Sequence, residues 1–238
     1  RFSTRAIPGR SSKKIRDLVT FGGLPAHGGP LSVTRLQIFP TRPGRRGSGA
    51  RGDVREAGGA GGQVRVKDLR SPLWHMKADC SMLTLQQLRV VRALVGGLGG
   101  SLGSFYAWDP AAQFPAADPD GSILGASNVQ IGGLGTTAKN LLLKGLPAGY
   151  VLTVGDMLAY DYGTSRALHQ VVTPQVVASG AGVTPEFEIH PPRRQGAAVN
   201  AAVTLVRAAA EMRIVPGTLN LSADHMVGQA GFEAMQVI

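Results

Sequence analysis

Short stretches in which apolar and polar residues alternate recur along this chain, and a period of two is typical of half-buried β-strands. Leu31–Phe39 and Gln63–Leu69 show the alternation most clearly. We predict further strands at Leu73–Cys80 and at Phe105–Pro110. The pattern therefore favours a mainly β protein.

The stretch from Gly125 to Arg194 predicts a compact β module set into the middle of the chain. Its runs are short, rich in β-forming residues and bounded by glycine, proline or aspartate, as strands joined by turns are. The runs are Gly149–Tyr160, Ala167–Val172 and Val183–Arg194.

Two more strands are expected after this module, at Val199–Val206 and at Glu211–Val215. The run Ala208–Ala210 has a high helix propensity, but the flanking valine, threonine and isoleucine favour a strand. The tail Ala223–Ile238 is short and mixed in pattern, and we assign no element to it. The organisation is thus one β domain that is interrupted by the module and completed by C-terminal strands.

One amphipathic helix is predicted from Leu85 to Val95. Thr84 and Gln87 have the spacing of a capping box, in which the threonine hydroxyl accepts from the backbone at Gln87 and the glutamine side chain reaches back. Apolar residues then follow at helical spacing, and Gly96-Gly97 is expected to stop the helix. These apolar residues are Leu88, Val91, Val95 and Leu98.

Two segments have the composition of irregular chain. Residues 1–30 are basic and then rich in glycine and proline, which predicts an extended arm. Pro40–Gly62 is punctuated by glycine, arginine and proline, and we interpret it as a mobile loop. It contains the triplet Arg51-Gly52-Asp53, which resembles an integrin-binding motif but is better explained as a chance triplet in such a loop.

The charge of the chain is concentrated at its start. The 238 residues carry a net charge of +10, and residues 1–70 contain 15 basic and 4 acidic residues. This predicts a neutral folded body with a basic arm, and three roles of the arm stay open: contact with nucleic acid, contact with an acidic surface of a neighbouring subunit, or no contact beyond solvent. Few aromatic residues accompany the charge, so phosphate contact is favoured over base stacking. The candidate contact residues are Arg5, Arg10, Lys13, Lys14, Arg16, Arg45, Arg46 and Arg51.

The sequence offers no convincing catalytic, cofactor or metal motif. Gly133-x-Gly135-x-x-Ala138 resembles a dinucleotide-binding turn, but the β pattern after it leaves little room for the required helix. Asp118 and Asp120 resemble part of a calcium loop, yet turn chemistry explains them better. The single cysteine, Cys80, is expected to be a small core residue. No apolar run is long enough to span a membrane.

The order of several weak motifs resembles the distal tail proteins of long-tailed bacteriophages and phage-like gene transfer agents. A strand over Gln63–Met76 leads into the helix, and Gly103-Ser-Phe-Tyr-Ala-Trp-Asp-Pro follows. The module then contains the turn Gly155-Asp-Met-Leu158 and closes with Glu186-Phe-Glu-Ile-His-Pro-Pro-Arg-Arg194. The likeness covers about Gln63 to Val215, whereas the arginine-rich segment Arg1–Arg55 does not match the family.

The resemblance implies a structural role without enzymatic activity, cofactor or metal. Such proteins form a ring, usually a homo-hexamer, at the distal end of the virion tail, after assembly in the host bacterial cytoplasm. The ring joins the tail tube protein to the hub protein and other tail-tip proteins of the baseplate, and DNA passes through its lumen. The segments expected at interfaces are the basic arm, the Pro40–Gly62 loop and the C-terminal segment.

The resemblance also implies a fold: a tail-tube-like β-sandwich with one flanking α-helix, interrupted by an inserted small β-barrel. We expect the arm at residues 1–30 and the split sandwich at residues 31–108 and 193–238, with the helix at 85–95. The inserted barrel is expected at residues 109–192.

Two other functions remain open. One is a nucleic-acid-associated assembly protein with a basic extension, suggested by the uneven charge. The other is a carbohydrate-binding tail-tip module in which aromatic rings stack on sugars, although such rings more often pack inside a barrel. Its candidate stacking residues are Trp108, Tyr150, Tyr160 and Tyr162.

Overall fold

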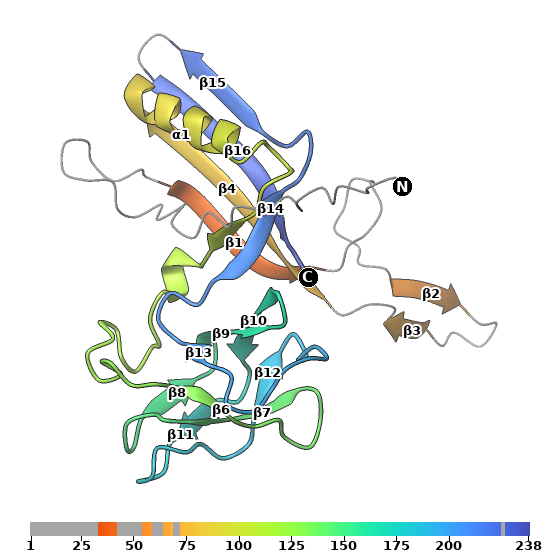
Figure 1. Cartoon of the computed structure of the whole chain (residues 1–238). Coiled ribbons are helices and arrows are strands. Elements are labelled where there is room, and N and C mark those ends of the chain that lie inside the picture. Colours follow the sequence, from red (N-terminus) through yellow and green to blue (C-terminus); the bar gives the residue numbers. More distant parts are fainter. Residues whose placement is uncertain (1–32, 42–53, 59–63, 69–71, 225–226) are drawn as a thin grey trace, which may run out of the picture.

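The computed structural model describes residues 33–41, 54–58, 64–68, 72–224 and 227–238 (Figure 1). Strands predominate in these ranges, which contain a single α-helix, and this confirms a mainly β protein with one helix and a small barrel. The candidate contact residues of the basic arm and loop, from Arg5 to Arg51, lie outside the described ranges.

The first body is a six-stranded sheet with the strand order β1-β4-β16-β14-β5, and β15 pairs with β16 beside β14. Apolar and polar positions alternate along its central strands, so one face is buried and the other is polar. Its strands are β1 (Val33–Thr41), β4 (Leu73–Leu83), β5 (Phe105–Ala107), β14 (Ala210–Ile214), β15 (Asn220–Asp224) and β16 (Val227–Gln236).

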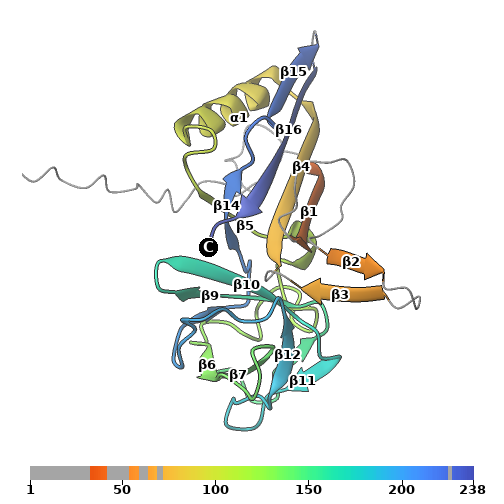
Figure 2. The same ribbon diagram turned by 90° about the vertical axis from the view of Figure 1, so that its right-hand side faces the viewer.

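Helix α1 (Leu85–Gly97) packs on the buried face of this sheet (Figure 2). The predicted capping box is confirmed, because Gln87 N donates to Thr84 Oγ1 at 3.2 Å and Thr84 N donates to Gln87 Oε1 at 2.9 Å. The predicted end at Val95 is wrong by two residues. The glycine pair forms the last helical positions, and the chain turns only at Gly99, whose φ is +68°.

The second body is a nearly closed barrel with the strand order β13-β9-β10-β12-β7-β6. Its two end strands approach each other, since Ile131 N donates to Ala201 O at 2.9 Å and Asn200 N donates to Ile131 O at 2.9 Å. The strands are β6 (Gln130–Gly133), β7 (Asn140–Lys144), β9 (Met157–Tyr162), β10 (Ser165–Val171), β12 (Phe187–His190) and β13 (Val203–Thr204). A separate pair, β8 (Val151–Thr153) and β11 (Gln175–Val177), shares the barrel core, and a short 3-10 helix, Pro110–Ala112, precedes the barrel.

The apolar core of the sheet extends onto the outside of the barrel, which also has a core of its own. Met157, Ala159 and Leu168 point out of the barrel and belong to the same buried cluster as Trp74 and Met76 of the sheet. Residues 157–160 are therefore buried on both faces of the strand, which explains the continuous apolar run Met-Leu-Ala-Tyr. Helix α1 covers one end of the sheet and the barrel covers the other end (Figures 1 and 2).

The structure corrects two sequence interpretations. The tail Ala223–Ile238 contains β16, which pairs with β4 on one side and with β14 and β15 on the other. This segment, to which the sequence assigned no element, therefore belongs to the sheet, and its expected place at a subunit interface stays a prediction. The predicted loop Pro40–Gly62 is also wrong in part, because Pro40 and Thr41 end β1 and residues 54–58 form β2.

Strand β2 (Val54–Gly58) pairs only with β3 (Val64–Asp68), and this hairpin projects from the side of the sheet (Figure 1). Within the described ranges the helix and the barrel cover the buried face of the sheet, and a second sheet of the expected sandwich is not found there. Strand β13 pairs with β9, so strand pairing in the barrel continues to Thr204, past the expected boundary at residue 192.

Candidate functional site

The junction between sheet and barrel is held by hydrogen bonds to the outer edge of β10. Trp74 Nε1 donates to Leu168 O at 2.7 Å. The side chain of Gln236 bridges the two bodies, because its Nε2 donates to Arg166 O at 3.2 Å and its Oε1 accepts from Trp74 N at 3.3 Å. The backbone carbonyls of β10 that are bonded in this way would otherwise be open to hydrogen bonds from a strand of another chain.

Arg166 extends from β10 to the sheet and is fixed at three points. Its Nε donates to Ala209 O at 3.0 Å, its Nη1 donates to Asp161 Oδ1 at 3.1 Å, and its Nη2 donates to Thr204 Oγ1 at 3.1 Å. Its guanidinium carbon lies 5.7 Å from the centre of the Tyr106 ring, within the range of a cation–π contact. Only 18% of its side chain is exposed.

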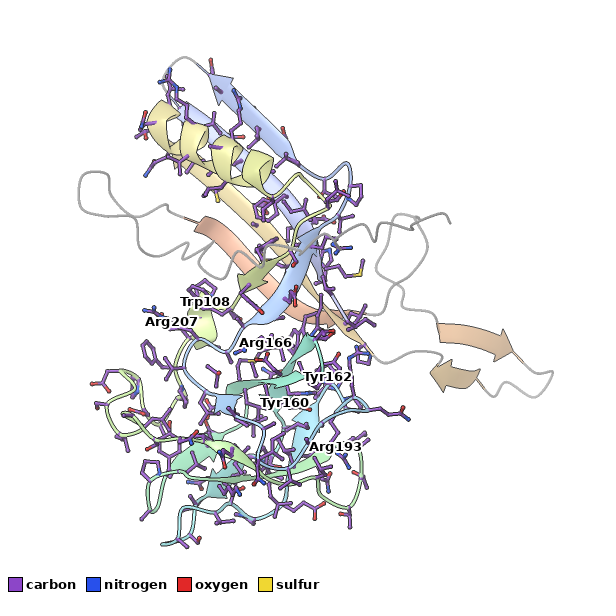
Figure 3. All side chains as sticks on the ribbon, viewed as in Figure 1. Trp108, Tyr160, Tyr162, Arg166, Arg193 and Arg207 are labelled. Atoms are coloured by element: carbon purple, nitrogen blue, oxygen red, sulfur yellow. The ribbon has the colours of Figure 1, made fainter. Side chains whose placement is uncertain are left out.

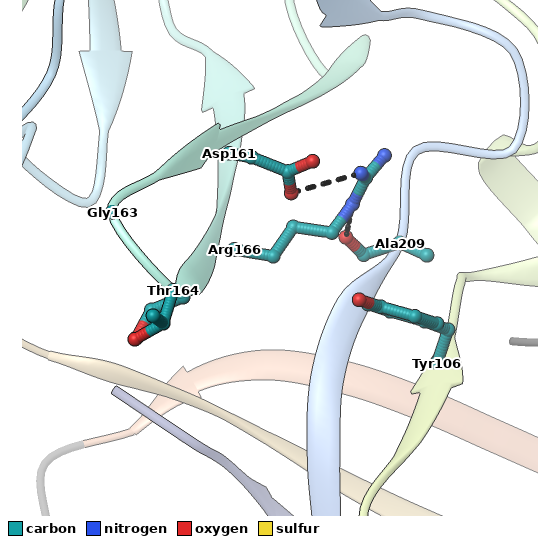
Figure 4. A pocket seen from close by; sticks show the side chains of 7 residues that line it. Tyr106, Asp161, Gly163, Thr164, Arg166 and Ala209 are labelled. Carbon is teal, nitrogen blue, oxygen red and sulfur yellow. Dashed lines mark hydrogen bonds and ion pairs between the residues drawn. The ribbon is translucent and has the colours of Figure 1, made fainter. Parts of the chain in front are cut away.

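A pocket of about 550 Å³ opens beside Arg166, between the tip of the β9–β10 hairpin and strand β5 (Figure 4). The close view shows Arg166 lying between the carboxylate of Asp161, the backbone of Ala209 and the ring of Tyr106. The lining of the pocket is Tyr106, Asp161, Gly163, Thr164, Ser165, Arg166 and Ala209.

The turn motif at Asp156 anchors the segment that enters the barrel. Asp156 is buried, and its carboxylate accepts from Ala116 N at 2.8 Å and from Thr153 N at 2.7 Å. Asp118 is also buried and accepts from Ile123 N at 3.1 Å and Leu124 N at 2.9 Å. Both carboxylates therefore hold loop backbone in place, and turn chemistry accounts for Asp118.

Tyr150, a candidate for sugar stacking, is buried and contacts this network. Its hydroxyl donates to Asp118 Oδ2 at 3.3 Å. Burial and, next, the charge of Asp118 raise the pKa of Tyr150 above its ordinary value. With 3% of the residue exposed, its ring has no free face for a sugar.

Tyr160, a second stacking candidate, pairs with His169 inside the barrel wall. The two rings stack with centroids 5.2 Å apart, and Tyr160 Oη lies 3.1 Å from His169 Nε2. His169 Nδ1 lies 2.7 Å from Pro191 O, which can only accept, so Nδ1 carries the proton and Nε2 accepts from Tyr160. Burial raises the pKa of Tyr160 to about 12 and lowers the pKa of His169 to about 4.

The other two stacking candidates, Trp108 and Tyr162, are half-buried and lie apart from each other (Figure 3). The guanidinium carbon of Arg207 lies 5.9 Å from the centre of the Trp108 ring. This contact joins the segment that follows β5 to the segment that precedes β14. The four predicted aromatic residues therefore do not form one binding face.

The polar face of the sheet is a second candidate surface. Its charges are mixed: His75 Nε2 lies 3.5 Å from Glu233 Oε2, and Lys77 Nζ lies 3.5 Å from Asp79 Oδ2. Ser104 Oγ donates to Glu211 Oε1 at 2.6 Å. The half-buried or exposed charged residues of this face are His75, Lys77, Asp79, Glu211, Arg213 and Glu233.

The remaining candidate groups have structural roles. Cys80 is buried, as predicted, and desolvation raises the pKa of its thiol. Glu186 accepts from Thr136 N at 2.7 Å, while Glu188 pairs with Lys139. Over the described residues, no group of three or more histidine, cysteine, aspartate or glutamate side chains could hold a metal ion. No helix within those same ranges is long and apolar enough to cross a membrane.

The sequence interpretation missed Arg166 and Tyr106. Arg166 sits in a run of small and apolar residues, Ser165–Leu168, and a lone arginine in such a strand is a usable signal for a buried polar contact. Comparison of the chain with models of known protein families finds no match, and comparison with curated proteins finds none either.

Proposed function

We propose that this chain is a structural subunit of a tail tip, acting as the distal tail protein of a long-tailed bacteriophage or a phage-like gene transfer agent. In this proposal copies of the chain form a ring, expected to be a hexamer, that joins the tail tube to the hub and lets DNA pass. The role is non-catalytic and belongs to the distal end of the virion tail.

The position of the barrel is the observation that carries the proposal. Strands β5 and β14 pair with each other, and the whole barrel lies in the connection between them. The chain thus combines a sheet with a flanking helix and a second β body that extends from one end of it (Figure 1). The same combination, in the same chain order, is what the resemblance implies for a ring subunit with an inserted barrel.

Two further features support assembly. Among the described strands β2 and β3 pair only with each other, and isolated two-stranded hairpins are marginally stable in water, so a neighbour is expected to support them. Strand β1, with nine residues, forms one edge of the sheet, and such edges provide ready contacts between subunits.

The mixed charge of the polar sheet face suits a channel wall. The described side chains on this face include the basic residues Lys77 and Arg213 and the acidic residues Asp79, Glu211 and Glu233. Positive and negative charges are therefore nearly balanced among them. A wall with balanced charges is hydrated but attracts the polyanion DNA only weakly as it passes through the lumen. We infer that this face lines the lumen of the ring.

The test is the mass and shape of the purified chain. Light scattering at moderate and high salt, followed by negative-stain imaging, is expected to show closed rings of about six copies with an open centre. Deletion of Arg1–Pro30, and in a second variant replacement of residues 54–68 by a glycine-serine linker, should reduce the ring fraction while the melting temperature stays unchanged. A monomer that binds arbitrary RNA with a steep salt dependence would instead favour the nucleic-acid alternative.

A further inference from the structure

The pocket beside Arg166 has the size and position of a small-molecule site. Its volume of about 550 Å³ lies in the range of ligand pockets. One wall is the tip of the β9–β10 hairpin, where Gly163 has a φ of +56°, and the opposite wall includes Tyr106 of β5. The pocket therefore lies where two bodies meet, a common location for binding sites.

Arg166 is preorganised to donate hydrogen bonds into this pocket. Three of its five N–H groups bind Ala209 O, Asp161 Oδ1 and Thr204 Oγ1, and two have no partner among the described residues. The ring of Tyr106 supports the guanidinium from one side. A donor that is already fixed loses little side-chain entropy when a ligand binds.

The charge of the pocket selects against anions. Asp161 neutralises Arg166, and 69% of the Asp161 side chain is exposed, so its carboxylate is open to a ligand. A phosphate or carboxylate ligand would meet this negative charge. A neutral polyol fits better, because each hydroxyl group can accept from Arg166 and donate to Asp161.

The remaining lining is also suited to a polyol. Thr164 and Ser165 bring hydroxyl groups to the lining, and Tyr106 brings an aromatic ring on which the C–H groups of a sugar can pack. We propose that this pocket binds a neutral saccharide, with Asp161 and Arg166 as the paired acceptor and donor. This role goes beyond the ring and does not depend on it, and it uses none of the four aromatic residues expected from the sequence.

The experiment uses the full chain, with saturation-transfer NMR for D-glucose, D-galactose, D-mannose and N-acetyl-D-glucosamine, and with 31P line broadening for inorganic phosphate, which has no C–H proton to observe. At least one sugar should receive saturation, and the phosphate signal should not broaden. The Asp161→Ala variant should bind that sugar about tenfold more weakly, because a charged hydrogen-bond acceptor is lost. The Glu188→Ala variant removes another exposed, ion-paired carboxylate elsewhere on the barrel, whose side chain is 47% exposed, and should bind like the parent chain.

A second variant separates loss of binding from loss of folding. Ser165→Gln fills the pocket without removing any bond of Arg166, and it should abolish sugar binding at an unchanged melting temperature. The proposal is overturned if none of the four sugars binds, if phosphate alone binds, or if Asp161→Ala and Ser165→Gln both bind like the parent chain.

Discussion

Gly228 of β16 lies directly under Leu88 of α1, so closely that a Cβ atom on the glycine would stand 3.1 Å from Leu88 Cβ. Leu88 Cβ is fixed by the helix backbone and cannot turn away. The distance between helix and sheet is therefore set by the absence of a side chain at this position.

Replacement of Gly228 by alanine should push the helix from the sheet and lower the free energy of unfolding by about 1–3 kcal/mol. Denaturant unfolding followed by circular dichroism measures the change. Gly180 is the matched control, because a Cβ there meets nothing within 4 Å. Gly180→Ala should leave stability equal or raise it by up to about 1 kcal/mol. Equal effects of the two variants would contradict the close packing.

Trp74→Phe should keep most of the apolar contact at the junction but lose the hydrogen bond to Leu168 O. Because the carbonyl is then left buried without this donor, we expect a loss of about 1–3 kcal/mol in unfolding free energy. Trp108→Phe, at a half-buried site with a cation–π contact, should cost at most about 1 kcal/mol. If Trp74→Phe is as mild as Trp108→Phe, the junction bond contributes little.

Asp156→Asn should loosen the segment that enters the barrel. The carboxylate accepts on both oxygens, from Ala116 N on one and Thr153 N on the other, and an amide can accept on only one. We expect a loss of about 2 kcal/mol in unfolding free energy and faster proteolysis near residue 116. Glu188→Gln, at an exposed ion pair, should change stability by less than about 1 kcal/mol.

His169 should make the folded state sensitive to mild acid. Its pKa falls from 6.5 to about 4 because burial disfavours the charged ring, so the unfolded chain binds its proton first as pH drops. Stability is then full above pH 6.5 and decreases as pH falls towards 4, by up to about 3 kcal/mol. Unfolding free energies at several pH values measure this, and His169→Gln should flatten the slope between pH 6.5 and 4. An unchanged slope would assign the acid sensitivity to other groups.

Local patterns in the sequence predicted the elements that depend on neighbouring residues. The capping box at Thr84 and Gln87 involves residues three apart, and the structure has both of its hydrogen bonds. The alternation over Leu73–Cys80 likewise marks a strand that alternates between a buried and a polar face, and the alternation over Gln63–Leu69 coincides with strand β3.

Strand β16 was not predicted because three of its five buried positions, Gly228, Ala230 and Ala234, are small, and glycine and alanine have weak β propensity. The close approach of the helix requires the glycine at position 228, and the sequence does not reveal that contact. The junction was missed for a related reason: Trp74 and Gln236 are 162 residues apart, and no local pattern reports such a contact.

The order of strands along the chain has a consequence for biosynthesis. All six barrel strands precede β14 along the chain, so the barrel can close before the sheet is complete. The sheet closes last, because β16 inserts between β4 and β14 and is translated after both. Until β16 emerges, β4 and α1 expose apolar surface and an unpaired edge. A nascent chain that stalls before Val227 is therefore expected to need chaperone protection.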